Sequence, residues 1–104
     1  MRVELLWWEG CPSTDKAHEL LRDALAGEGL DPDVVELVEI ETDGDAERER
    51  FVGSPTIRIG GVEVAPAHDE PVGLNCRVYR LRDGRVSPTP DPEDIREAIR
   101  EATS

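Results

Sequence analysis

The sequence predicts an α/β protein whose core is a mixed four-stranded sheet flanked by helices, in the order β-α-β-α-β-β-α. Near the N-terminus, a strand pattern, a helix pattern and a second strand pattern follow one another. Such a unit forms two parallel strands joined by a right-handed crossover. Two short β-branched runs then surround Gly60 and Gly61, which is typical of an antiparallel hairpin. A chain of 104 residues has room for one core, so we expect a single domain over residues 1–104.

The first strand and the first helix are expected at residues 2–8 and 12–27. The strand segment is mostly branched or aromatic and is expected to be buried. Pro12 suits the first helical position, where a missing backbone N–H costs nothing. The apolar residues that follow recur at helical spacing and predict a core-facing stripe of Ala17, Leu20, Leu21, Ala24 and Leu25. Gly27 and Gly29 end the helix.

Residues 34–40 carry apolar side chains almost without interruption, which predicts a strand covered on both faces. A short acidic helix is expected at 43–51 and ends at Gly53. The hairpin strands follow at 56–59 and 62–64.

The last helix is expected to begin after Asp91, which is a candidate N-cap, with Pro92 at the first helical position. Its predicted buried stripe consists of Ile95, Ala98, Ile99 and Ala102. Before it, residues 65–90 form an insertion whose centre, 78–86, alternates around Asp-Gly and predicts a second small hairpin. An insertion of this length in so short a domain is more often functional than idle.

Composition argues against several classes of partner. A net charge of −12 disfavours nucleic acid and anionic membranes. No stretch approaches the ~20 apolar residues of a membrane span, and the first apolar run is too short for a signal peptide, so we expect a cytoplasmic protein. Four arginines nevertheless gather within nine residues that contain one acid: Arg77, Arg80, Arg82 and Arg85. They are either a solvated hairpin surface or a site for an anion or a thiolate.

The two cysteines are the main candidates for chemistry, because in a reducing compartment a cysteine pair is seldom a structural staple. Cys11 lies where the first strand gives way to the helix, and the unpaired N–H groups of a helix N-terminus favour the reactive thiolate. The alternative for Cys11 is a small buried apolar residue. Cys76 has apolar neighbours and is equally compatible with a place in the core. In residues 53–56 (Gly-Ser-Pro-Thr), a proline soon after a helix-ending glycine favours a tight turn with a cis bond before Pro55.

Three motifs in this order resemble the thioredoxin superfamily, and in particular its small bacterial thioredoxin-like proteins. They are residues 10–12 (Gly-Cys-Pro), 53–56 (Gly-Ser-Pro-Thr) and 73–77 (Gly-Leu-Asn-Cys-Arg). The resemblance covers about residues 2–64 and 91–102. Thr14 stands where a thioredoxin has the second cysteine of its Cys-x-x-Cys motif, so the local resolving thiol is missing.

The resemblance implies a thioredoxin-like fold in which a cis Pro55 faces Cys11 and the backbone of Thr56 pairs with an extended substrate. The expected activity is thiol–disulfide exchange, with Cys11 as the nucleophile and Cys76 or a low-molecular-weight thiol as the resolving group. The alternative is a non-catalytic module that binds a soft metal through thiolates, or a protein partner. No cofactor and no resident metal are expected. The residues expected to contact a thiol or disulfide substrate are Trp8, Pro12, Ser54, Thr56 and Arg77.

Cys76 lies twelve residues beyond the expected fourth strand, so chain length permits a disulfide with Cys11 but does not force it. Thr14 is expected either to direct its hydroxyl toward the Cys11 sulfur or simply to cap the helix. Arg77 would favour a Cys76 thiolate if both were exposed. His18 lies ~10 Å along the helix from Cys11, too far for a general base, and is assigned to the surface. His68 is a candidate for a metal site with the cysteines, although no ligand spacing supports it.

Overall fold

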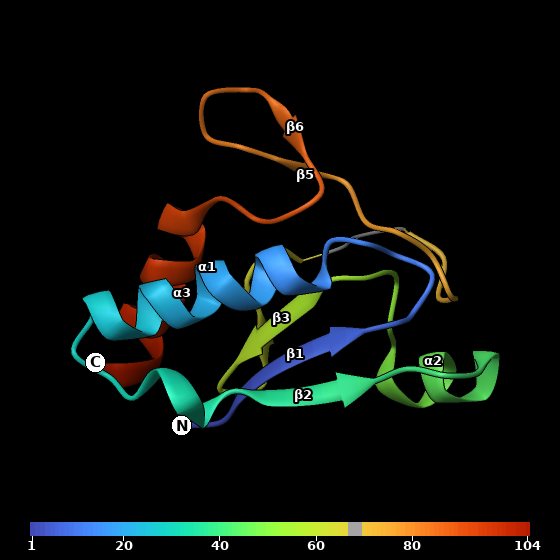
Figure 1. Cartoon of the computed structure of the whole chain (residues 1–104), viewed down its shortest axis with the longest axis horizontal. Coiled ribbons are helices and arrows are strands. Elements are labelled where there is room, and N and C mark those ends of the chain that lie inside the picture. Colours follow the sequence, from blue (N-terminus) through green and yellow to red (C-terminus); the bar gives the residue numbers. More distant parts are fainter. Residues whose placement is uncertain (67–69) are drawn as a thin grey trace.

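The computed structural model describes residues 1–66 and 70–104, in which three α-helices flank a four-stranded mixed sheet (Figure 1). The strands of the sheet are β1 (Val3–Trp7), β2 (Glu36–Glu39), β3 (Thr56–Ile59) and β4 (Val62–Glu63). The helices are α1 (Thr14–Gly27), α2 (Asp43–Glu49) and α3 (Pro92–Thr103), and a short 3-10 turn, η1 (Pro32–Val34), precedes β2. A separate hairpin consists of β5 (Tyr79–Arg80) and β6 (Val86–Ser87). None of the helices in this described part of the chain has the length and apolar character needed to cross a membrane.

Strand pairing places β1 inside the sheet, whose order is β2-β1-β3-β4. β1 is parallel to β2 and antiparallel to β3, and β3 is antiparallel to β4, so the predicted parallel unit and the predicted hairpin are both present. Leu6 of β1 lies opposite Thr56 of β3. The end of β1 therefore lies beside the start of β3, which brings the two motif-bearing turns to one edge of the molecule.

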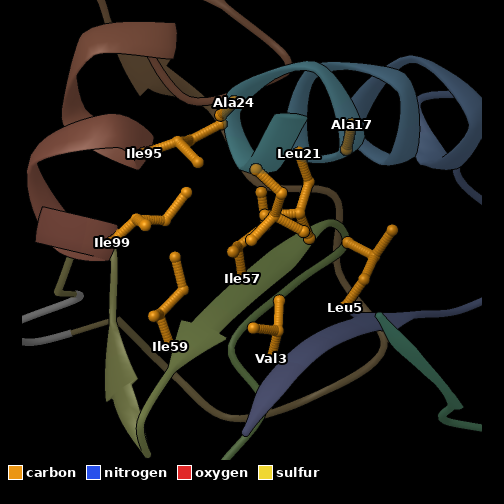
Figure 2. Packing of buried hydrophobic residues seen from close by; sticks show 10 residues of the cluster. Val3, Leu5, Ala17, Leu21, Ala24, Ile57, Ile59, Ile95 and Ile99 are labelled. Carbon is orange, nitrogen blue, oxygen red and sulfur yellow. The ribbon is translucent and has the colours of Figure 1, made fainter. Parts of the chain in front are cut away.

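Helices α1 and α3 cover one face of the sheet and enclose the larger core (Figure 2). Its buried members are Val3, Leu5, Ala17, Leu21, Ala24, Leu25, Ile57, Ile59, Ile95 and Ile99. Burying a leucine or isoleucine side chain stabilises the fold by ~1.5–3 kcal/mol, so this face supplies most of the apolar stabilisation. The predicted α1 stripe is confirmed, with Leu20 only partly buried. In α3, Ala102 is exposed, because its last turn lies beside the turn at Gly60 rather than over the sheet.

The second face of the sheet carries a smaller core beneath α2, made of Leu6, Ile40, Ala46 and Phe51. Thr42 caps α2, and its side chain accepts a hydrogen bond from the Asp45 N–H at 3.0 Å. The helix ends at Glu49 rather than at the predicted residue 51, because Arg50 adopts a left-handed conformation with φ 52°. This reversal releases Phe51 from the helix and lets it enter the core.

Two expectations about the first parallel unit are wrong. Helix α1 begins at Thr14, with Ser13 as its N-cap, so Pro12 lies in the preceding turn and not at the first helical position. Strand β2 is not covered on both faces, since Leu37 is 53% exposed. The reason is the strand order: β2 lies at an edge of the sheet, and α1 and α3 pack over β1 and β3.

Candidate functional site

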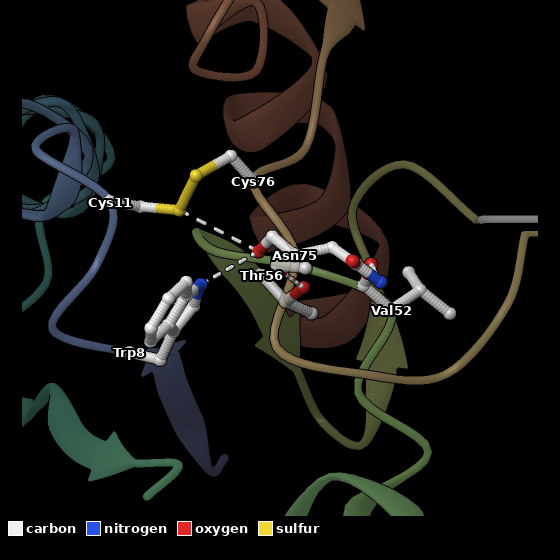
Figure 3. Close-up of a disulfide and its surroundings, with 7 residues drawn as sticks. Trp8, Cys11, Val52, Thr56, Asn75 and Cys76 are labelled. Carbon is white, nitrogen blue, oxygen red and sulfur yellow. Dashed lines mark hydrogen bonds between the residues drawn. A yellow bond between two sulfur atoms is a disulfide. The ribbon is translucent and has the colours of Figure 1, made fainter. Parts of the chain in front are cut away.

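The two cysteines meet beyond the end of β1 (Figure 3). They form a disulfide with Cα atoms 5.8 Å apart, within the usual range, although 65 positions separate them in the sequence. Cys11 lies in the turn between β1 and α1, whereas Cys76 lies in the segment that leads to β5. The predicted insertion therefore returns to the first cysteine before it forms its own small hairpin.

The two ends of the disulfide differ in exposure. Cys11 is buried, with 5% of its surface accessible, and Cys76 is exposed. The suggestion that Cys76 belongs to the core is therefore wrong. Cys11 is buried, as its alternative assignment required, but it is bonded to another sulfur rather than acting only as apolar packing.

The Trp8 side chain lies beside the disulfide. Its Nε1 donates a hydrogen bond to the Asn75 carbonyl at 3.0 Å. Its ring lies so close to Gly10 that a Cβ at that position would come within 2.0 Å of a ring carbon. A side chain at position 10 would therefore displace the Trp8 ring from its place beside the disulfide.

The segment that carries Cys76 is docked on the turn before β3. The Ser54 N–H donates to the Asn75 carbonyl at 2.8 Å, and the Arg77 N–H donates to the Ser54 carbonyl at 2.9 Å. These bonds form a parallel bridge between Ser54 and Cys76. A Cβ on Gly53 would lie 2.6 Å from the Cγ of Arg77, so the two segments can approach this closely only because position 53 is a glycine. The backbone groups of Ser54, two residues before Thr56, are therefore already hydrogen-bonded to the segment that carries Cys76.

The turn before β3 has the predicted cis bond between Ser54 and Pro55. Thr56 is fully buried, and its hydroxyl donates to the Gly53 carbonyl at 2.7 Å. The Pro55 carbonyl accepts a hydrogen bond from the hydroxyl of Tyr79. Burial raises the pKa of Tyr79, so this hydroxyl stays a protonated donor at ordinary pH.

Arg77 is buried beneath the docked segment, with 6% of its surface exposed. Its guanidinium donates to the Ala65 carbonyl at 2.7 Å, lies 3.8 Å from a carboxylate oxygen of Glu63, and stacks over the Tyr79 ring at 4.5 Å. The condition under which Arg77 would favour a Cys76 thiolate, exposure of both, is therefore not met. These contacts anchor the segment just after Cys76, and the hydrogen bond from Trp8 to Asn75 anchors it just before Cys76.

The other three arginines of the predicted cluster do not converge on one site. Arg80 and Arg85 are satisfied within the β5–β6 hairpin, and Arg82 forms ion pairs with Asp94 and Glu97 of α3. In the described part of the chain these three arginines thus form a solvated surface on and beside the hairpin, whereas Arg77 does not. The ion pairs of Arg82 attach the hairpin to α3.

Asn75 is a residue of the site that the sequence did not reveal. Its carbonyl accepts hydrogen bonds from Trp8 and Ser54, and the same oxygen lies 3.6 Å from the Cys11 sulfur (Figure 3). A backbone carbonyl has no side-chain signature, so proximity to Cys76 was its only signal.

A pocket of about 280 Å³ opens beside Cys11. Its walls are formed by Trp7, Glu9, Cys11, Pro12, Thr14, Asp15, His18 and Leu37. The Thr14 hydroxyl is buried and has no hydrogen-bond partner in the described residues, and Ser13 holds the N-cap position, so the capping role suggested for Thr14 is wrong. His18, assigned to the surface from the sequence, is half-buried and lines the same pocket as Cys11, so that assignment is only partly correct.

His68 lies outside the described residues. Within residues 1–66 and 70–104, no group of three or more histidine, cysteine, aspartate or glutamate side chains is arranged to hold a metal ion.

No family model, curated protein or solved structure matches this chain. The fold defines a mixed α/β protein with a four-stranded sheet. The site is a disulfide that joins the turn after β1 to the segment before β5.

Proposed function

We propose that this is a thioredoxin-like thiol–disulfide exchange protein whose redox centre is the Cys11–Cys76 pair. One observation carries the proposal: the only two cysteines of the chain meet at a surface where one of them is exposed. The element order, with α1 and α3 on one face of the sheet and α2 on the other, agrees with the fold that the sequence resemblance implies.

The chemistry requires a thiol or disulfide substrate and no cofactor. In the reductive direction, an external thiolate forms a mixed disulfide with one cysteine and displaces the other as a thiolate. A second external thiolate then releases the first cysteine, which leaves a protein dithiol and one external disulfide. In the reverse direction, the dithiol reduces an external disulfide and the protein disulfide returns. Low-molecular-weight thiols of the cytoplasm are suitable partners.

Contacts other than the disulfide hold the two sulfurs near each other. The Ser54 bridge, the Trp8–Asn75 hydrogen bond and the buried Arg77 all fix the segment that carries Cys76. These contacts do not depend on the sulfur–sulfur bond. We therefore expect the dithiol form to keep its cysteines at a high effective concentration, so that the disulfide closes again after each cycle.

Equilibration with glutathione buffers of graded composition tests the proposal, with free thiols alkylated and counted by mass spectrometry. We expect both cysteines to change together, at a potential of about −200 to −270 mV, the range of cytosolic thiol proteins. A disulfide that opens only far below about −300 mV, or only when the protein unfolds, would mark a structural staple and defeat the proposal. A dithiol that captures one Hg(II) ion but exchanges with no disulfide would favour the binding-module alternative.

A further inference from the structure

We propose that external thiols and disulfides enter the exchange at Cys76, and that Cys11 is the inner sulfur that leaves and later resolves. This order rests on the exchange function proposed above. It reverses the order suggested by the sequence, in which Cys11 at the helix start attacks first.

Access to the sulfurs is the first reason. Cys11 is 5% exposed and its sulfur lies 3.6 Å from the Asn75 carbonyl, to which Trp8 also donates, whereas Cys76 is exposed. Thiol–disulfide exchange depends on which sulfur an incoming thiolate can reach, so the exposed Cys76 is the sulfur open to attack.

The backbone hydrogen bonds around Cys76 also favour entry at this cysteine. The bridge to Ser54 uses the carbonyl of Asn75 and the N–H of Arg77, the two neighbours of Cys76. In a bridge of this kind, the N–H and C=O of the central residue point away from the partner strand. Cys76, which is exposed, therefore directs its own backbone N–H and C=O away from Ser54, where they can pair with an incoming molecule.

The surroundings of Cys11 suit a leaving sulfur. Cys11 precedes α1, whose N-terminus has no side-chain cap and so offers unpaired N–H groups to a nearby negative charge. The buried Thr14 hydroxyl, which has no hydrogen-bond partner in the described residues, lines the same pocket as Cys11. The Asn75 carbonyl is the unfavourable neighbour, but it already accepts hydrogen bonds from Trp8 and Ser54. We infer that the Thr14 hydroxyl donates to Cys11 when that sulfur becomes a thiolate.

An external thiolate attacks the Cys76 sulfur, a new sulfur–sulfur bond forms there, and the electron pair of the protein disulfide leaves on Cys11. A second external thiolate attacks the external sulfur of this mixed disulfide, and Cys76 leaves as a thiolate. In the reverse direction Cys76 attacks the external disulfide, and Cys11 then attacks Cys76 and expels the second external thiolate.

The first test maps the mixed disulfide in the full-length oxidised protein. The protein is mixed with reduced glutathione, quenched with acid at successive early times, alkylated at its free thiols and digested for tandem mass spectrometry. We expect the glutathione adduct on Cys76 and the alkyl group on Cys11, with the preference strongest on extrapolation to zero time. The adduct on Cys11 with Cys76 alkylated would overturn the proposed order while leaving the exchange function intact. A failure of glutathione to open the disulfide at all would overturn the exchange function, and the order with it.

The second test measures the role of Thr14 on the rate of that first step. Thr14→Val removes the hydroxyl at nearly constant volume and should slow the opening of the disulfide about tenfold, as expected for one hydrogen bond to a developing anion. Thr14→Ser keeps the hydroxyl and should restore most of the rate. Urea unfolding of the oxidised variants separates this effect from a loss of stability. Equal rates for Thr14→Val and the unchanged protein would overturn the part assigned to Thr14.

Discussion

The sheet with its three helices and the segment from Gly73 to Tyr79 are held together by different forces. The larger core is a continuous set of apolar side chains from β1, β3, α1 and α3. The segment contributes only Leu74 to an apolar cluster. It is otherwise fixed by the Ser54 bridge, by hydrogen bonds of Trp8 and Tyr79, by the buried Arg77 and by the disulfide. Apolar packing is distributed over many contacts, whereas polar and covalent anchors are few and each can be removed alone. Removing one of these anchors should therefore release the segment that carries Cys76 while the larger core stays folded.

The largest expected effect comes from removing the covalent anchor. Replacing both Cys11 and Cys76 by serine opens a loop of 65 residues, and the chain-entropy model gives a loss of about 4 kcal/mol in the free energy of unfolding. Urea denaturation followed by circular dichroism measures this loss. We expect native helix content in the absence of urea, because the larger core is untouched. A variant without native helix content would mean that the segment is needed for the sheet and helices to fold.

A matched pair of leucines compares the two regions directly. Leu21 is fully buried in the larger core, and Leu21→Ala should cost about 3 kcal/mol. Leu74 is only partly buried, and Leu74→Ala should cost about 1 kcal/mol. Both are measured by urea denaturation of the oxidised protein. Equal losses would show that the segment belongs to the core as fully as α1 does.

The polar anchor is tested with Arg77→Ala, for which we expect a loss of about 2 kcal/mol, because buried hydrogen-bond partners lose their donor. The control is Arg82→Ala, which removes exposed ion pairs and should cost less than about 1 kcal/mol. The backbone amides of Ser54 and of residue 77 should exchange their hydrogens with solvent faster in Arg77→Ala than in Arg82→Ala. Unchanged protection in Arg77→Ala would indicate that the disulfide and Trp8 suffice to dock the segment.

The last expected effect is at Asp91, which joins the hairpin to α3. Hydrogen bonds from the backbone N–H groups of Arg82 and Glu93 lower the pKa of Asp91 below its usual value. A lowered carboxylate pKa stabilises the fold above the ordinary aspartate value, and this contribution is lost as pH falls through the pKa of the folded state. Asp91→Ala should therefore cost about 1 kcal/mol near neutral pH and remove part of the acid sensitivity. If Asp91→Ala still lowers the free energy of unfolding by about 1 kcal/mol at a pH below the folded-state pKa of Asp91, this explanation is contradicted.

The sequence predicts most of the fold because periodicity and capping are local. The α1 stripe, the Asp91 cap and the antiparallel hairpin at Gly60 and Gly61 are read from neighbouring residues. The exposure of Leu37 depends instead on the order of strands in the sheet, which a run of apolar residues does not encode.

In the site, the cysteines and the cis bond before Pro55 have recognisable motifs, and the structure brings these motifs together. The burial of Arg77 and the role of the Asn75 carbonyl follow from the path of the insertion, which turns side chains and backbone groups toward distant segments. No local pattern marks that path.

The attachment of Cys76 by Arg77 has a practical consequence for finding the cellular partner. Because the segment stays beside Cys11 after the disulfide opens, a partner linked to Cys76 would be expelled by Cys11 before it could be isolated. Pull-down with the unaltered protein would thus recover little. Bait carrying Cys11→Ser keeps Cys76 accessible and lacks the expelling sulfur, so it should retain the partner until a reducing agent elutes it.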